Sequence, residues 1–397
     1  MTADSAAPEP AAPDDPLAKA HELIPMLRSH SARSEHDSTL APEVVTALRD
    51  AGLFRLTTPA KFGGHDLNLS AQARVIAAVA RGCASAGWVV AAEAASTMLC
   101  NVVSEAAMAE AFDGRPDTLM LSTAVDQTRS VATPTEGGFL LSGYCRYATG
   151  AEISDWALVS AIPVKRGDED HVFSCMMPMS DVTVERSWNV TGMGGTGTHG
   201  LVIDNVFVPE HRTRQFRVAE VLALDEDDRP TYFVQASLTT LAALVGAAQG
   251  ALDVVRETLL KDSLPKDAQT DYRVNGAVES AGIRLWFAEA AHLIDSSMLH
   301  LMHAMGRLDG VAYEEPVPWL ERADLRMHAS TSVQLARQGM EKLLDISGTR
   351  GFALSNPLQR YWRDLGVGSR HVSFHGPTLL EDYSLALWGK RPSLILI

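Results

Sequence analysis

The chain has 397 residues, of which 46% are hydrophobic and 21% charged, and its 34 basic and 49 acidic residues give a formal net charge of −15. The length exceeds one small domain, the composition is that of a globular protein, and the acidic balance disfavours a nucleic-acid partner. The longest apolar runs fall short of the roughly eighteen residues of a membrane span, and four widely spaced cysteines without a Cys-x-x-Cys pair favour a reducing cytoplasm.

The first segment, residues 1–16, is predicted to be a disordered tail, because Ala, Pro, Asp and Glu dominate it and large apolar side chains are few. Its acidic, proline-broken start does not resemble an export signal. Over residues 17–117 the apolar residues recur at helical spacing, as in Val44, Val45 and Leu48. This pattern predicts an N-terminal helical domain.

Residues 118–217 change to short β-rich runs bounded by Gly, Pro, Asp and Thr, which are strand signals. They predict a central β-barrel or sandwich domain. The runs are Phe139–Gly143, Trp156–Ser160, Val172–Met176, Gly200–Asp204 and Val206–Pro209.

Residues 218–397 return to helical periodicity, so the fold class is α+β. Two segments, Leu238–Leu260 and Val278–Met305, are apolar around most of their circumference. Such helices are buried, which predicts a C-terminal bundle that also packs against other subunits. The apolar end Leu394–Ile397 is expected to lie against a neighbouring surface.

The stretch Gly192–Gly197 matches the dinucleotide pattern G-x-G-x-x-G by letter only. That motif requires a strand before it and a helix after it, whereas here a predicted strand follows. We therefore expect a glycine turn and no nicotinamide-nucleotide site. Thr196, Thr198 and His199 remain as polar groups that could line a cleft.

His300 and His303 are spaced to share one face of a helix, but no third ligand accompanies them. The sequence therefore gives only weak support for a metal site. A G-x-S-x-G hydrolase elbow is also absent. His371 and His375 are more informative, because on a helix the positions i and i+4 share a face. Both imidazoles would then meet one cavity.

The order of domains, and several motifs, resemble the acyl-CoA dehydrogenase fold, with an N-terminal helical domain, a central β-barrel or sandwich domain and a C-terminal four-helix bundle. The resemblance covers residues 17–390. The motifs are Gly52-Leu53-Phe54 with Pro59 and Gly63-Gly64, Val206-Phe207-Val208-Pro209, and Ile346-Ser347-Gly348-Thr349-Arg350-Gly351-Phe352 followed by Pro357 and Arg363-Asp364.

Within that superfamily the chain is most similar to the two-component flavin-dependent monooxygenases, whose oxygenase component takes reduced flavin from a separate reductase. The dehydrogenases commonly carry a Glu base in a Tyr-Glu-Gly-Thr motif, and the similar place here holds His375 in Phe374–Thr378. The features shared with the monooxygenases are Gly194–Thr198, Tyr147–Gly150 followed by Asp155-Trp156, and Gly368–His371.

This resemblance implies that reduced FMN or FAD reacts with O2 to give a C4a-(hydro)peroxyflavin, which hydroxylates a small aromatic or polyketide-like substrate. His371 would be the catalytic acid or base. The monooxygenases often have an Asp four residues later, where His375 stands, so the role of His375 stays open. Thr149 would hold the flavin N5 position and stabilise the adduct.

The resemblance also assigns the remaining site residues. Core packing is the simpler interpretation of Trp88. Further cofactor contacts would be Ser122, Thr123, Tyr147, Gly150, Ser347 and Gly348, and the substrate would meet Trp88, Ser96 and Phe374.

Other functions remain open at this point. One is an acyl-CoA dehydrogenase-type desaturase with a displaced base, another is N- or S-oxygenation of an amine or sulfur substrate, and a third is a catalytically silent scaffold. For the main interpretation we expect a cytoplasmic homotetramer that receives reduced flavin by diffusion from a flavin reductase. A metal, a nucleic acid and a membrane are not expected.

Overall fold

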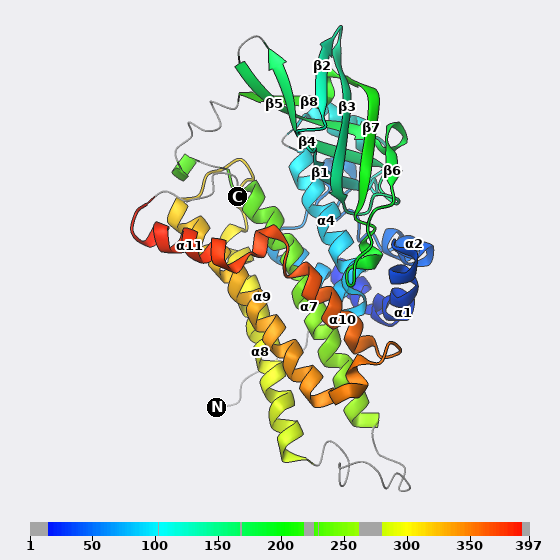
Figure 1. Ribbon diagram of the computed structural model, residues 1–397, viewed down its shortest axis with the longest axis vertical. Coiled ribbons are helices and arrows are strands. Elements are labelled where there is room, and N and C mark those ends of the chain that lie inside the picture. The colour runs from blue at the N-terminus through cyan, green and yellow to red at the C-terminus, as the bar shows by residue number, and fades with distance from the viewer. Residues whose placement is uncertain are drawn as a thin grey trace.

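The computed structural model describes residues 15–101, 103–166, 169–217, 226–228, 230–261 and 280–390. Most of the predicted tail, and the end Leu394–Ile397, lie outside these ranges. Asp15 caps the first helix, accepting a hydrogen bond from Leu17 N–H at 2.9 Å. Figure 1 shows a β domain at one end of a long helical body.

The N-terminal part is helical, as predicted. Side-chain caps set several helix starts: Asn68 accepts from Ala71 N–H and Ser104 from Ala107 N–H. The predicted apolar face of α2 packs into the core, where Val44 and Leu48 are fully buried. The helices are α1 (Pro16–Asp37), α2 (Pro42–Asp50), α3 (Leu69–Gly82), α4 (Ala84–Cys100) and α5 (Glu105–Phe112).

The central part is a sandwich of two four-stranded sheets, ordered β1-β4-β5-β8 and β2-β3-β7-β6. Phe139 and Phe173, one from each sheet, stack at 5.0 Å between ring centroids in the core between them. The strands are β1 (Met120–Ala124), β2 (Val131–Thr135), β3 (Gly138–Ala148), β4 (Trp156–Arg166), β5 (Glu169–Pro178), β6 (Thr183–Glu185), β7 (His199–Pro209) and β8 (Thr213–Arg217).

One strand differs from the sequence-based expectation. The runs Gly200–Asp204 and Val206–Pro209 are not separate strands but the single strand β7. Asn205 takes a left-handed conformation with φ of 52°, and its N–H donates to Ser142 Oγ at 3.0 Å. This irregularity shifts the pairing with β3 without ending the strand.

The C-terminal helices form a bundle in which α7 contacts α8, α9 and α10, while α11 packs on α9. The predicted segment Leu238–Leu260 lies within α7, and the described part of Val278–Met305 lies within α8, which Ser280 caps. The helices are α7 (Tyr232–Lys261), α8 (Ala281–Leu308), α9 (Trp319–Ser347), α10 (Pro357–Gly368) and α11 (Gly376–Leu387).

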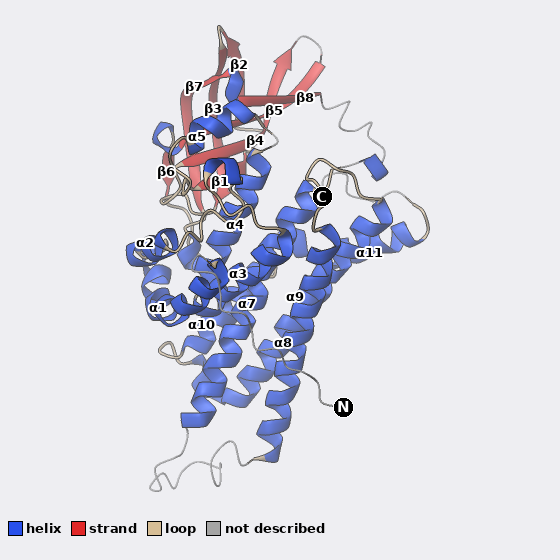
Figure 2. Ribbon diagram, turned by 180° about the vertical axis from the view of Figure 1, so that it is seen from behind, coloured by secondary structure: helices blue, strands red, loops and turns tan. Residues whose placement is uncertain are grey.

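Helix α7 is the centre of the helical body. It also contacts α3 and α4, so the N-terminal and C-terminal helices share one hydrophobic core, apart from that of the sandwich. Its segment Val234–Leu260 is long and apolar enough to cross a membrane, yet 78% of the most apolar window is buried inside the fold. Figure 2 shows this helix enclosed by others, as a core helix is.

Candidate active site

Strand β1 meets helix α4 through two serine hydroxyls. Ser96, 1% exposed, donates to the Ala92 carbonyl at 2.7 Å, and its Oγ lies 2.9 Å from Ser122 Oγ. Thr123, the next residue on β1, donates its hydroxyl to the carbonyl of Arg146 on β3 at 2.8 Å. The structure thus brings the predicted pair Ser122 and Thr123 together with Ser96.

Three threonine hydroxyls form a hydrogen-bonded row beside the end of β3. Thr149 Oγ1 lies 3.1 Å from Thr198 Oγ1, which lies 2.7 Å from Thr196 Oγ1. Thr196 donates to the carbonyl of Met193 at 2.8 Å, which fixes the direction of the chain. Thr149 is half-buried, so its hydroxyl stands at the open end of an otherwise buried row.

Tyr147 is held in an unusual position just before this row. Its backbone has φ of 60°, its side chain is 68% exposed, and its ring stands edge-on to Trp188 at 6.2 Å between centroids. A large exposed aromatic side chain on a left-handed backbone is typical of a ligand-contacting position. Together with Thr198, both rings line a cavity of about 260 Å³, to which Arg129 and Arg146 contribute cations.

The glycine-rich segment is a turn that supports this cavity. It leads into β7, as predicted, and a short 3-10 helix, η3 (Gly194–Thr196), occupies its middle. Trp188 Nε1–H donates to the Met193 carbonyl at 2.8 Å, and the Met193 N–H donates to Asp364 Oδ1 at 2.5 Å. Burial raises the pKa of Asp364 to about 6.

His199 does not line a cleft. It is 1% exposed, its Nδ1 accepts from Trp188 N–H at 3.2 Å, and its Nε2 faces the Ser38 carbonyl at 3.1 Å. Both ring nitrogens are therefore used within the fold, and the residue ties three segments together.

The end of α10 brings His371 to helix α4. The imidazole stands edge-on to Trp88 at 5.7 Å and lies 6.0 Å from the Phe374 ring, measured between centroids. Gly368 permits this approach, since a Cβ there would lie 2.8 Å from Met193 Cε and 3.4 Å from Trp88 Cζ3. Trp88 and Phe374 are buried, at 9% and 3% exposure, so both serve as core packing as well as walls beside the histidine.

His371 retains an exposed edge, although protein atoms crowd its ring. This desolvation lowers the pKa of His371 below its ordinary value. Its Nδ1 accepts a long hydrogen bond, 3.3 Å, from Ser373 N–H. The neutral ring then carries its hydrogen on Nε2, which is left for a ligand.

The expectation that His371 and His375 share one helix face is wrong. His371 caps a 3-10 helix, η8 (Val372–Phe374), and His375 precedes α11. Pro377 starts α11, which separates the two segments. The exposed His375 instead places its Nδ1 2.8 Å from Thr378 Oγ1.

Ser347 and Gly348 lie away from His371: they stand near the N-terminal end of α10, whereas His371 follows its C-terminal end. Ser347 Oγ donates to the Leu343 carbonyl at 2.9 Å. The twelve-residue helix α10, about 18 Å long at 1.5 Å per residue, separates them from His371. One protomer alone does not bring them to Thr149.

His300 and His303 face a third histidine rather than a metal shell. His300 Nδ1 lies 2.8 Å from His328 Nδ1, and the His303 and His328 ring centroids are 4.5 Å apart. In the described ranges no group of three His, Cys, Asp or Glu residues could hold a metal ion.

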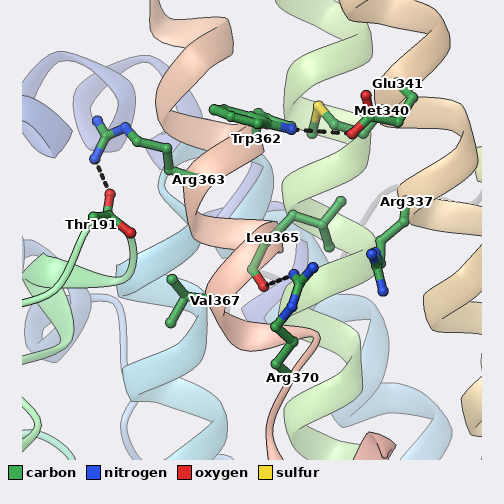
Figure 3. Close-up of a pocket in the computed structure, with 10 residues that line it drawn as sticks. Thr191, Arg337, Met340, Glu341, Trp362, Arg363, Leu365, Val367 and Arg370 are labelled. Atoms are coloured by element: carbon green, nitrogen blue, oxygen red, sulfur yellow. Dashed lines mark hydrogen bonds between the residues drawn. The ribbon is translucent and has the colours of Figure 1, made fainter. Parts of the chain in front are cut away.

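The largest cavity described, about 710 Å³, lies on the outer side of α10, and none of the predicted site residues lines it. Figure 3 shows side chains of α9 and α10 facing a common space, where Trp362 donates to Glu341 Oε1 at 3.1 Å. Arg370, at one edge, directly precedes His371. The cavity therefore adjoins the site but is not its centre.

The arrangement around β1 and β3 fits an isoalloxazine ring. A flat aromatic ligand needs an apolar wall and polar groups at its rim. Tyr147 and Trp188 supply aromatic surface, Thr149 and Ser122 supply hydroxyls, and Arg129 with Arg146 supplies charge for a flavin phosphate. The residues present therefore fit a flavin.

Sequence reasoning gave no site role to three residues of this region. Trp188 lines the cavity, Asp364 anchors the glycine-rich turn, and Glu93 lies buried beside Gly150. Asp364 stood in the motif Arg363-Asp364 without a role, and Glu93 carried a signal as the single charged residue of the apolar helix α4.

Comparisons with known proteins agree with this geometry. The acyl-CoA dehydrogenase N-terminal domain matches residues 20–111 and the C-terminal domain residues 238–375, together more than half of the chain. The oxygenase component of an FADH(2)-dependent resorcinol hydroxylase from Rhizobium sp. is 28% identical, covering 92% of each chain. A pigment production hydroxylase from Rhodococcus sp. is 28% identical over 89% of this chain and 91% of its own.

A solved structure, XiaF from Streptomyces sp. in complex with FADH2 and glycerol, superposes with a TM-score of 0.84, at 27% identity over 96% of both chains. The predicted fold class is confirmed by these matches. The chain therefore belongs to the acyl-CoA dehydrogenase superfamily and, within it, to the oxygenase components of flavin-dependent monooxygenases.

Proposed function

We propose that this protein uses reduced flavin and O2 to hydroxylate a small aromatic substrate. The observation that carries the proposal is that Met193 joins two groups of residues. Its carbonyl accepts from Trp188, which lines the aromatic cavity beside Tyr147, and its side chain lies against Gly368, at the end of the helix that precedes His371. Relatives named as a resorcinol hydroxylase and an indole-3-acetate monooxygenase support an aromatic substrate class.

The flavin would be held by residues of the β domain. Tyr147 would flank the ring, Ser122 and Thr123 would bond its pyrimidine rim, and the Thr149–Gly150 turn would hold its N5 edge. When bound, reduced flavin supplies the electrons that activate O2. The row of hydroxyls behind Thr149 ends on the Met193 carbonyl, so the Thr149 hydroxyl keeps a defined orientation.

His371 exchanges a proton with the substrate. Its lowered pKa keeps the imidazole neutral near pH 7, and its long contact to Ser373 N–H leaves the ring free to change tautomer at small cost. Trp88 and Phe374 hold the ring and exclude water from one side, while Ser96 lies deeper, behind Ser122. Once the ring has moved its hydrogen to Nδ1, Nε2 can accept the proton of a phenolic hydroxyl, and the phenol becomes more electron-rich at the ring carbon that is oxidised.

A desaturase reaction is less well supported. His375, which stands where the dehydrogenases carry their Glu base, is exposed and bonds to Thr378. None of the contacts described for His375 reaches Thr149 or Trp88. We keep His375 as the control position for His371.

The proposal includes a separate flavin reductase, a homotetramer and a cytoplasmic location. Helix α8 exposes Leu285, Trp286 and Leu299 to solvent in one protomer, and burial of such surface in an assembly is worth about 25 cal/mol per Å². Ser347 and Gly348 could reach a flavin only across such an interface. All four cysteines are unpaired and buried, as suits a reducing compartment.

The test is to supply the cofactor by two routes. Chemically reduced flavin with O2 should give hydroxylated product from a panel of phenols, with no second protein present. NADH and oxidised flavin should give none without a reductase. Reduction of bound flavin by NADH alone would contradict the proposal.

A further inference from the structure

Helix α4 carries a buried acid that the proposed chemistry does not use. Glu93 is 1% exposed, and its carboxyl group faces the turn that follows β3. Oε1 lies 2.9 Å from Ser154 Oγ, and a Cβ built on Gly150 would lie 3.1 Å from the same Oε1. The acid therefore touches the turn that carries Thr149.

Two oxygen atoms compete for the hydroxyl proton of Ser154. Ser154 Oγ lies 2.9 Å from Glu93 Oε1 and 2.9 Å from the carbonyl of Gly150. A hydroxyl has one proton to donate, and a carbonyl oxygen can only accept. If Ser154 donates to Gly150, Glu93 must donate to Ser154, and a carboxyl group can donate only when it is protonated.

The surroundings of Glu93 favour the neutral form independently of this count. Its Oε2 is buried and has no hydrogen-bond partner, and the nearby cation Arg49 lies 3.9 Å from Asp155 rather than in an ion pair with Glu93. An ionised carboxylate in that position would be a poorly solvated charge. Burial raises the pKa of Glu93 well above its ordinary value and Asp155 adds to the rise, while the Ser154 hydrogen bond, the Met120 backbone N–H and the charge of Arg49 oppose it.

Helix α4 links two segments that would hold the cofactor. Glu93 reaches the Thr149–Gly150 turn through Ser154, and Ser96, one helical turn later, reaches Ser122 on β1. Support matters here because Tyr147, two residues before the turn, has a left-handed backbone with φ of 60°, which costs a non-glycine residue energy.

We propose that Glu93 is a neutral carboxylic acid in the folded protein, and that its proton, donated to Ser154, positions the Thr149–Gly150 turn. Glu93 is thus a positioning residue that acts through Ser154. Its effect on the flavin rests on the proposed function, whereas its protonation does not.

The first experiment tests protonation without any flavin. The unfolded chain releases the Glu93 proton above the ordinary glutamate pKa, while the folded chain keeps it. The contribution of Glu93 to the free energy of unfolding of the wild type therefore falls as pH rises. Glu93→Gln has no proton to release. The Tm of Glu93→Gln minus that of wild type should therefore rise steadily from about pH 5 to about pH 8. A difference independent of pH would overturn the protonation claim.

A matched control separates this effect from a general change in charge. Glu105 has an exposed side chain and pairs with Lys61 at 2.5 Å. Glu105→Gln also removes one negative charge and should show no such rise with pH. An equal rise in both variants would also overturn the proposal.

The second experiment tests positioning. Glu93→Gln keeps a donor for Ser154 and should retain reduced-flavin affinity and the yield of product per flavin oxidised. Glu93→Ala and Ser154→Ala both break the link and should lower that yield at least about tenfold, given the cost of losing a buried hydrogen bond. The positioning role would be overturned if Glu93→Gln gave no product while Glu93→Ala still folded and bound flavin.

The two experiments distinguish the failure of this inference from that of the proposed function. If the wild-type protein bound no reduced flavin, the proposed function would fail, while the pH dependence of Tm would still decide the state of Glu93.

Discussion

The imidazole of His371 stands edge-on to the indole of Trp88, with 5.7 Å between ring centroids, although 283 positions separate them in the chain. This contact joins the end of α10 to α4, the helix that also packs against β1. It fixes one side of the imidazole while another edge stays exposed, as an acid or base that meets a substrate requires.

Replacing His371 by Ala should lower the rate of product formation by about 10² to about 10⁴, which is the usual worth of general acid or base catalysis. Reduced-flavin affinity should change little, because the flavin contacts lie on the β domain. Steady-state rates and a flavin titration measure the two effects. The control is His375→Ala, which should be mild; a large loss there with a mild His371→Ala would move the acid or base role to His375.

Replacing Thr149 by Ala should uncouple the reaction. The hydroxyl that ends the threonine row is lost, so more of the reduced flavin should be oxidised without product, and more hydrogen peroxide released. The ratio of peroxide to product measures this. Thr149→Ser keeps the hydroxyl and should restore most of the coupling; if it behaved like Ala, the hydroxyl would not be the important group.

The pH dependence of the rate should report His371. Its pKa is lowered by burial, so the imidazole stays neutral to pH values below the ordinary histidine range. The rate should therefore fall only as the pH drops below about 6.5, with a midpoint under that value. In His371→Ala this limb should vanish from the residual activity; a limb that survives unchanged would belong to another group.

Asp364 should be important for stability rather than for chemistry. Asp364→Ala leaves the buried Met193 N–H without an acceptor, at a cost of about 1 to about 3 kcal/mol in the free energy of unfolding. Denaturant unfolding measures this loss. Asp364→Asn keeps an acceptor and should lose much less.

Asp364→Asn should also change how stability depends on pH. The pKa of Asp364 is raised from 3.8 to about 6 in the fold. The Tm of Asp364→Asn minus that of wild type should therefore rise as pH goes from about 4 to about 6 and level off above. A difference that does not rise over this range would contradict the raised pKa.

Much of the fold could be predicted from the sequence because it depends on local periodicity. The apolar run in α7 and the alternating runs in β3, β4 and β5 follow from side-chain spacing alone. The continuity of β7 could not, since it depends on Asn205 adopting a left-handed turn supported by Ser142, which is 63 positions away.

The site was predicted in part, for a similar reason. The resemblance of motifs placed Ser122, Thr149 and His371 in one hypothesis, and the structure shows which neighbours each of them has. Residue spacing suggested a helix through His371 and His375, but Pro377 begins a new helix there. The partnership of Glu93 with Ser154, 61 positions apart, arises only from packing.

The most direct test of the account is the origin of the oxygen atom in the product. The protein would be given chemically reduced flavin, a phenolic substrate and isotope-labelled O2, and the product examined by mass spectrometry. The account predicts one labelled oxygen atom in each product molecule, and no product when the flavin is supplied oxidised. A product with unlabelled oxygen, or a desaturated product formed from oxidised flavin and an electron acceptor, would contradict it.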